Sequence, residues 1–98
     1  MTIPKSFKLA GQRWKVTIVK RYMTGYGECD YATRTIRIAS SVDGKPTTDG
    51  ERLQTFLHEW WHAFEHVSGQ DANETSAVLF ENLMYETLLT MRGAHDEV

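Results

Sequence analysis

Residues 48–69 read TDGERLQTFLHEWWHAFEHVSG, and this stretch decides the fold. Large apolar side chains recur in it at spacings of three and four residues, which is the period of a helix with one wide apolar face. They are Leu53, Leu57, Trp60, Trp61, Phe64 and Val67. Thr48 and Glu51 fit a capping box, and Gly69 suits the left-handed residue that ends many helices. We therefore expect a helix over about residues 51–67.

A second helix is expected directly after this one, over about residues 71–92. Asp71 is a candidate N-cap, and five side chains beyond it form an apolar row. They are Ala77, Phe80, Met84, Leu88 and Met91. Because the turn between the helices is short, we expect the two long helices to pack antiparallel and to lie against one face of a sheet.

The residues before position 40 have the period of strands instead. Trp14, Val16 and Ile18 alternate with polar residues, as in a half-buried strand, and Ile36 and Ile38 do the same. This pattern predicts a three- to four-stranded antiparallel sheet over about residues 5–40. The connection over residues 40–50 is expected to be exposed and irregular. The whole chain, residues 1–98, is then a single domain of the α+β class.

Length and composition limit the possible functions. A chain of 98 residues has no room for a nucleotide-binding domain with a separate substrate domain. A net charge of −2 argues against a nucleic-acid partner, which requires an excess of Lys and Arg. No apolar run is long enough for a signal peptide or a membrane span. The single cysteine, Cys29, cannot form an internal disulfide, which favours a reducing cytoplasm.

The motif His58-Glu59-Trp60-Trp61-His62 lies inside the first predicted helix. Histidines four residues apart project from one side of a helix, separated by about 6 Å along its axis, and can bind one zinc ion together. Glu59 lies next to the first histidine, where it can act as a general base towards water activated by the metal. This is the physical content of the pattern H-E-x-x-H, which predicts zinc-dependent peptide hydrolysis.

A catalytic zinc site usually has three protein ligands, so a third residue is needed. His66 is too far along the helix from His58, by about 12 Å, and Glu65 points away from the pair. The second helix returns past the histidines and offers Glu74 and Glu81, which bracket the facing position. Spacing alone does not choose between these two glutamates.

The chain resembles the compact zinc metallopeptidases called gluzincins, in particular the small phage and prophage enzymes of the ImmA/IrrE type. The resemblance covers IPKSFKLAGQRWKV at residues 3–16, YGECDYATRTIRIA at residues 26–39 and HEWWHAFEHVSG at residues 58–69. It implies a minimal zincin-like fold and a peptide or protein substrate. In that group a glutamate that opens the second helix, in an E-x-x-[AV] pattern, is the third ligand. Glu74-Thr75-Ser76-Ala77 matches that pattern, so the resemblance favours Glu74 over Glu81.

Peptide hydrolysis also needs donors for the developing oxyanion and a way to hold the peptide. Tyr26, Tyr31 and Tyr85 are candidate donors. The strand at residues 35–39 is a candidate sheet edge on which an extended peptide could add as a further strand.

Two other functions fit the same residues. The chain could be a non-catalytic, zinc-stabilised protein-binding or inhibitory module of phage origin, because zinc adds folding energy to small domains. It could also be a helical interaction protein without metal, in which Trp60 and Trp61 are core or interface anchors.

Overall fold

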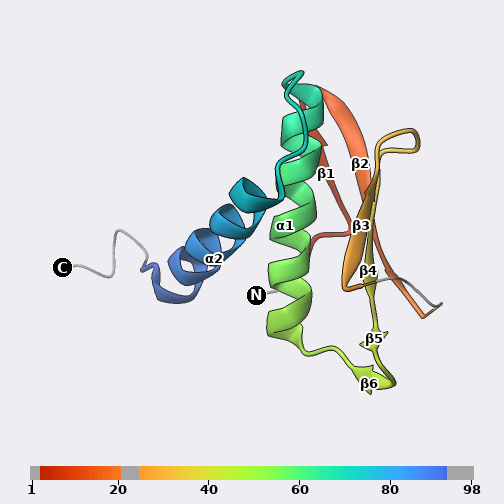
Figure 1. Ribbon diagram of the computed structural model, residues 1–98, viewed down its shortest axis with the longest axis vertical. Coiled ribbons are helices and arrows are strands. Elements are labelled where there is room, and N and C mark those ends of the chain that lie inside the picture. The colour runs from red at the N-terminus through yellow and green to blue at the C-terminus, as the bar shows by residue number, and fades with distance from the viewer. Residues whose placement is uncertain (1–2, 21–24, 93–98) are drawn as a thin grey trace.

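The computed structural model describes residues 3–20 and 25–92, and within them the chain is an α+β fold, as expected (Figure 1). Six strands precede two helices. The strands are β1 (Ser6–Leu9), β2 (Gln12–Val19), β3 (Gly27–Asp30), β4 (Thr35–Ala39), β5 (Ser41–Val42) and β6 (Lys45–Pro46). The helices are α1 (Asp49–Val67) and α2 (Glu74–Thr90).

The main sheet has four strands in the order β1-β2-β4-β3 and is mixed rather than antiparallel. β1 pairs with β2, and β3 with β4, as antiparallel neighbours, but β2 and β4 run parallel with Val16 opposite Ile36. The reason is that β4 turns back from β3 and inserts between β2 and β3, so that its other neighbour is β2, which runs in the same direction. The β4 side chains Ile36 and Ile38 are almost fully buried, and a central position covers them better than an edge would.

β4 is therefore not a sheet edge, and the expectation that residues 35–39 form one is wrong. The edges are β1 and β3. On β4, Arg37 forms ion pairs of 3.1 Å with Glu28 and with Asp30, which tie the edge strand β3 to its neighbour. Of the two edge strands, β3 is the one with extensive contacts to α1.

The connection after β4 is more ordered than expected, since β5 and β6 form a small antiparallel hairpin within residues 40–50. Thr47 follows this hairpin and donates a hydrogen bond of 2.8 Å to the carbonyl of Ala39. Arg52 of α1 in turn donates to the Thr47 hydroxyl at 2.8 Å. These contacts fix the start of α1 against the end of the sheet.

Both predicted ends of α1 are confirmed. Thr48 is the N-cap and forms the complete capping box with Glu51, while Gly69 has a positive φ of 72° just beyond the helix. The N-cap of α2 is Asn73, not Asp71, because the Asn73 side chain accepts the hydrogen bond from the Ser76 amide. Glu74 therefore stands in the first turn of α2, next to the cap.

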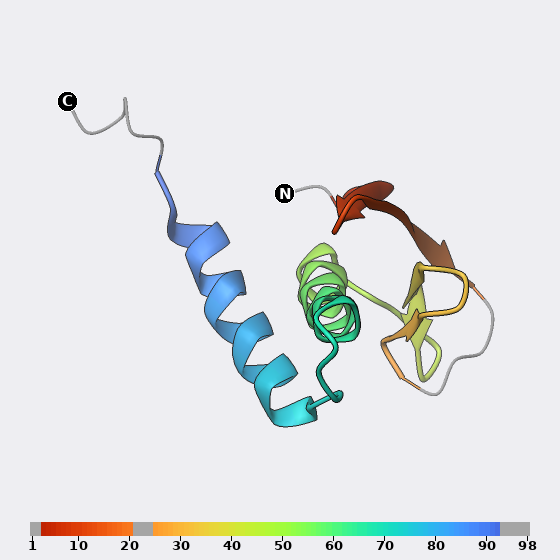
Figure 2. The same cartoon turned by 90° about the horizontal axis from the view of Figure 1, so that it is seen from above.

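Figure 2 looks along α1 and shows α1 between the sheet and α2. α2 appears lengthwise in this view, so it crosses α1 obliquely instead of running back antiparallel to it, and it does not cover the sheet beside α1. Phe80 of α2 stacks on Trp60 and Trp61, with ring centroids 5.6 and 4.8 Å apart, and so joins the two helices. No helix in the described part of the chain is long and apolar enough to cross a membrane.

Candidate metal centre

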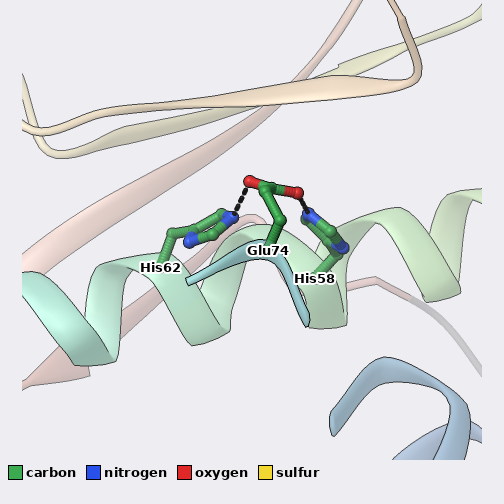
Figure 3. A group of neighbouring side chains, drawn as sticks. All are labelled: His58, His62 and Glu74. Atoms are coloured by element: carbon green, nitrogen blue, oxygen red, sulfur yellow. Dashed lines mark hydrogen bonds and ion pairs between the residues drawn. The ribbon is translucent and has the colours of Figure 1, made fainter. Parts of the chain in front are cut away.

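Three predicted ligands meet on the side of α1 that faces the start of α2. Figure 3 shows the Glu74 carboxylate lying between the imidazole rings of His58 and His62. One Glu74 oxygen is 3.1 Å from His58 Nε2 and the other is 2.7 Å from His62 Nε2. One ligand atom from each of the three residues lies within 4.8 Å of the other two, so this group could hold a metal ion.

The second nitrogen of each imidazole is bound to another carboxylate. Glu81 Oε1 lies 2.8 Å from His58 Nδ1, and Glu65 Oε1 lies 2.9 Å from His62 Nδ1. Such contacts orient metal-binding histidines and leave Nε2 free to bind the ion. Glu81, the alternative third ligand, is thus bonded to the ring nitrogen of His58 that faces away from Glu74.

The Nε2 atom of His62 gives a second observation that bears on whether a cation fits here. The His62 side chain is 7% exposed, and its contact with Glu74 is short but lacks the geometry of a hydrogen bond. Within the part of the chain that the structure describes, this buried nitrogen has no hydrogen-bond partner. A buried nitrogen normally has one, so a ring nitrogen without one beside two further ligand atoms fits a metal-binding position.

The pKa of His58 is affected by opposing influences. Burial lowers the pKa, but the hydrogen bond to Glu81 and the negative charges of Glu59, Glu74 and Glu81 outweigh burial and leave the pKa above its usual value. The surroundings of this ring therefore favour a positive charge, as a metal-binding site does.

Glu59, the predicted general base, lies beside the ligand group and is 8% exposed. Burial raises the pKa of its carboxyl, while the nearby His58 and His62 oppose the rise. A carboxylate with a raised pKa accepts a proton more readily near neutral pH. Glu59 is not one of the three residues that together could hold a metal ion.

A cavity of about 580 Å³ opens over these residues. His58, Glu59, His62, Glu74 and Glu81 are among the residues that line it. Tyr26, Gly27, Glu51, Gln54 and Thr55 complete the lining. The cavity thus brings the ligand group, the candidate base and one of the three candidate tyrosines together.

The other two tyrosines are placed elsewhere. Tyr31 stacks on the ring of His66, with centroids 4.4 Å apart, at the surface. The hydroxyl of Tyr85 lies against Gly50, where an added Cβ would be 2.6 Å from it. Neither Tyr31 nor Tyr85 is among the residues that line the cavity over the ligand group, so Tyr26 is the candidate donor that the structure favours.

Gly27 is a part of the site that the sequence did not single out. A Cβ at this position would lie 2.5 Å from Thr55 Cγ2 and 2.9 Å from the Arg37 carbonyl oxygen. The edge strand β3 can therefore approach α1 closely only with glycine here. No helical or strand period marks such a position, because the requirement comes from packing between two elements.

Glu65 Oε1 lies 2.9 Å from His62 Nδ1, a contact that the sequence analysis did not predict. The i,i+3 spacing of the two residues places them side by side on a helix and could have indicated the contact.

Comparison of the chain with family models, with curated proteins and with solved structures gave no match. The motif and the geometry of the site therefore provide the indications of function.

Proposed function

We propose that the protein is a zinc-dependent metallopeptidase of the gluzincin kind, similar to the small phage and prophage enzymes of the ImmA/IrrE type. The observation that carries this proposal is the convergence of His58 Nε2, His62 Nε2 and the Glu74 carboxylate on one point, with Glu59 beside them in an open cavity. Each histidine is also held at Nδ1 by a further carboxylate.

The choice of zinc follows from the donor set. Two imidazoles and one carboxylate suit zinc, whereas calcium and magnesium prefer oxygen ligands only. Three protein ligands leave a fourth position open, which is typical of catalytic zinc sites rather than structural ones. When bound, zinc supplies Lewis acidity and makes hydroxide available near neutral pH.

The chain's own residues then have distinct roles. Glu59 accepts the proton from the attacking water and later donates it to the leaving amine, because it is the buried carboxylate beside the ligands that is not itself a ligand. Tyr26 lines the open cavity and is assigned to contact the substrate or its developing oxyanion. A cavity of about 580 Å³ has room for a short peptide segment.

The test combines metal analysis with a peptidase assay on an unfolded protein and on a mixed fluorogenic peptide set. We expect one zinc per chain, and we expect Glu59→Gln to keep zinc and thermal stability while peptide cleavage falls by about 10²–10⁴-fold. Glu86→Gln is the matched control, because Glu86 is exposed on α2 and does not line the cavity.

Full peptide cleavage by Glu59→Gln would overturn this mechanism. Zinc binding without cleavage by the wild type would instead favour the zinc-stabilised binding module.

A further inference from the structure

We propose that Glu65 is a positioning residue that assembles the metal site from two helices at once, by orienting His62 on α1 and the first turn of α2, from which Glu74 comes. The inference deepens the proposed function and rests on the proposed zinc site. It starts from an unusual feature of α1, a glutamate that is 2% exposed although it lies near the end of a helix in a small domain.

The two oxygens of this carboxylate serve different helices. Oε1 lies 2.9 Å from His62 Nδ1, within α1. Oε2 accepts a hydrogen bond from the backbone N–H of Asn73 at 3.1 Å, at the start of α2. It also lies 3.4 Å from the Ser76 hydroxyl, whose single proton is shared with the Asn73 carbonyl oxygen at 3.1 Å. Glu65 therefore spans the junction between the helix that carries two ligands and the helix that carries the third.

These contacts also explain how the charge is tolerated. A buried carboxylate is costly unless it is paired and hydrogen-bonded. Among the described residues Glu65 has no ion pair with Lys or Arg, so its partners are the His62 ring and the N-terminus of α2, whose dipole favours a negative charge. The Trp61 indole N–H adds to this network by donating to the Ser76 hydroxyl at 3.1 Å.

Two consequences for the metal site follow. An acceptor at Nδ1 holds the proton of His62 on that nitrogen, so the lone pair of Nε2 is directed at the metal position. The hydrogen bond to Asn73 fixes the N-cap of α2, and Glu74 is the next residue along the chain. Loss of the Glu65 charge should therefore loosen two ligands together.

Glu81 provides the natural comparison. It holds His58 Nδ1 at 2.8 Å from the middle of α2, but it has no recorded contact with the N-cap of that helix. A change at Glu81 should therefore disturb one ligand only. Ser76→Ala is a second control. It removes the Ser76 hydroxyl, with its contacts to Glu65, Trp61 and the Asn73 carbonyl, and leaves both the His62 contact and the Asn73 N–H bond of Glu65 in place.

The experiment measures zinc affinity by chelator competition for the wild type, Glu65→Gln, Glu81→Gln and Ser76→Ala. Absorption spectra of the cobalt-loaded proteins and unfolding temperatures of the metal-free proteins are recorded alongside. We expect zinc affinity to fall by about 10–100-fold in Glu65→Gln, less in Glu81→Gln, and hardly at all in Ser76→Ala. The cobalt spectrum should change in Glu65→Gln, because a positioning role alters the ligand geometry. A purely structural role would leave the spectrum unchanged.

A lower unfolding temperature in Glu65→Gln with unchanged zinc affinity and cobalt spectrum would overturn the inference and leave the zinc site standing. Absence of zinc binding by the wild type would remove the proposed function itself. If Glu65→Gln does not fold, long-range ¹H–¹⁵N spectra of the wild type decide the question. They should show the Nδ1-protonated form of the neutral His62 ring, and the Nε2-protonated form would contradict the role of Glu65.

Discussion

The two helices of this protein differ in what they bury: α1 buries charged and polar side chains, whereas α2 exposes apolar ones. α1 buries Glu59, His62 and Glu65 to 8% exposure or less. α2 leaves Leu79, Leu83 and Leu89 more than half exposed, and Ala77 is its only buried residue. Burial of charge costs free energy unless the charge is paired, so the buried polar residues of α1 require a functional explanation.

The difference arises from position in the layers. α1 lies between the sheet and α2, so it has neighbours on two sides (Figure 2). α2 has only α1 as a neighbour among the described elements with extensive contacts. Most of α2 should therefore tolerate substitution, and the exceptions should lie where it meets α1, at the histidines and at Ala77 and Phe80.

Glu74 provides the strongest challenge to this contrast, because its side chain is 75% exposed and yet it is a proposed ligand. We expect Glu74→Ala to weaken zinc binding by more than the roughly 100-fold that loss of an outer partner of a ligand can cause. The unfolding temperature of the metal-free protein should not change, since an exposed side chain adds little to stability.

Chelator competition and thermal unfolding measure the two effects of Glu74→Ala, with Glu86→Ala as the control on the same helix. Equal zinc affinity in both variants would exclude Glu74 as a ligand.

The packing side of the contrast is tested by one leucine from each helix. Leu57 of α1 is 7% exposed and Leu83 of α2 is 55% exposed. Leu57→Ala should lower the free energy of unfolding by about 2–3 kcal/mol, near the lower end for a buried leucine. Leu83→Ala should lower it by less than about 0.5 kcal/mol. Urea denaturation gives both values, and a comparable loss at Leu83 would mean that the outer face of α2 is covered in solution.

The same contrast explains what could be predicted from the sequence. α1 was predicted with both of its ends, because its apolar period, the Thr48–Glu51 capping box and Gly69 are local signals. The start of α2 was misplaced because Asp71 and Asn73 are both good caps, and Glu65 binds the Asn73 amide across a gap of eight residues. The crossing of the helices depends on aromatic packing around Phe80, which no spacing reveals.

The sheet was less predictable than the helices for a similar reason. Alternation in β2 and β4 identifies two strands with an inner and an outer face, but it carries no information about which strands are neighbours. The central place of β4 depends on contacts between residues such as Val16 and Ile36, twenty positions apart. In the site, the closeness of His58 and His62 followed from helix geometry alone, whereas the close packing at Gly27 and the contacts of Glu65 depend on how separate elements meet.

The smallest expected effect concerns the reactivity of Cys29 on β3. Glu59 is buried, which implies little water between the sheet and α1, and the rate at which the Cys29 thiol is alkylated tests this. Burial, followed by the nearby charge of Glu59, raises the pKa of the Cys29 thiol to about 12. The thiolate is the reactive form, so alkylation of the folded protein by iodoacetamide at pH 8 should be at least about tenfold slower than in urea.

Glu59→Gln should speed the alkylation of Cys29 modestly, because it removes a negative charge that opposes the thiolate, while burial remains. Glu86→Gln, far along the exposed helix, should leave the rate unchanged. Mass spectrometry of samples taken over time measures all of these rates. Alkylation of the folded wild type at the rate seen in urea would show that water reaches the face of α1 that carries Glu59. The polar side chains of α1 would then be hydrated, and their burial could not be contrasted with the exposure of α2.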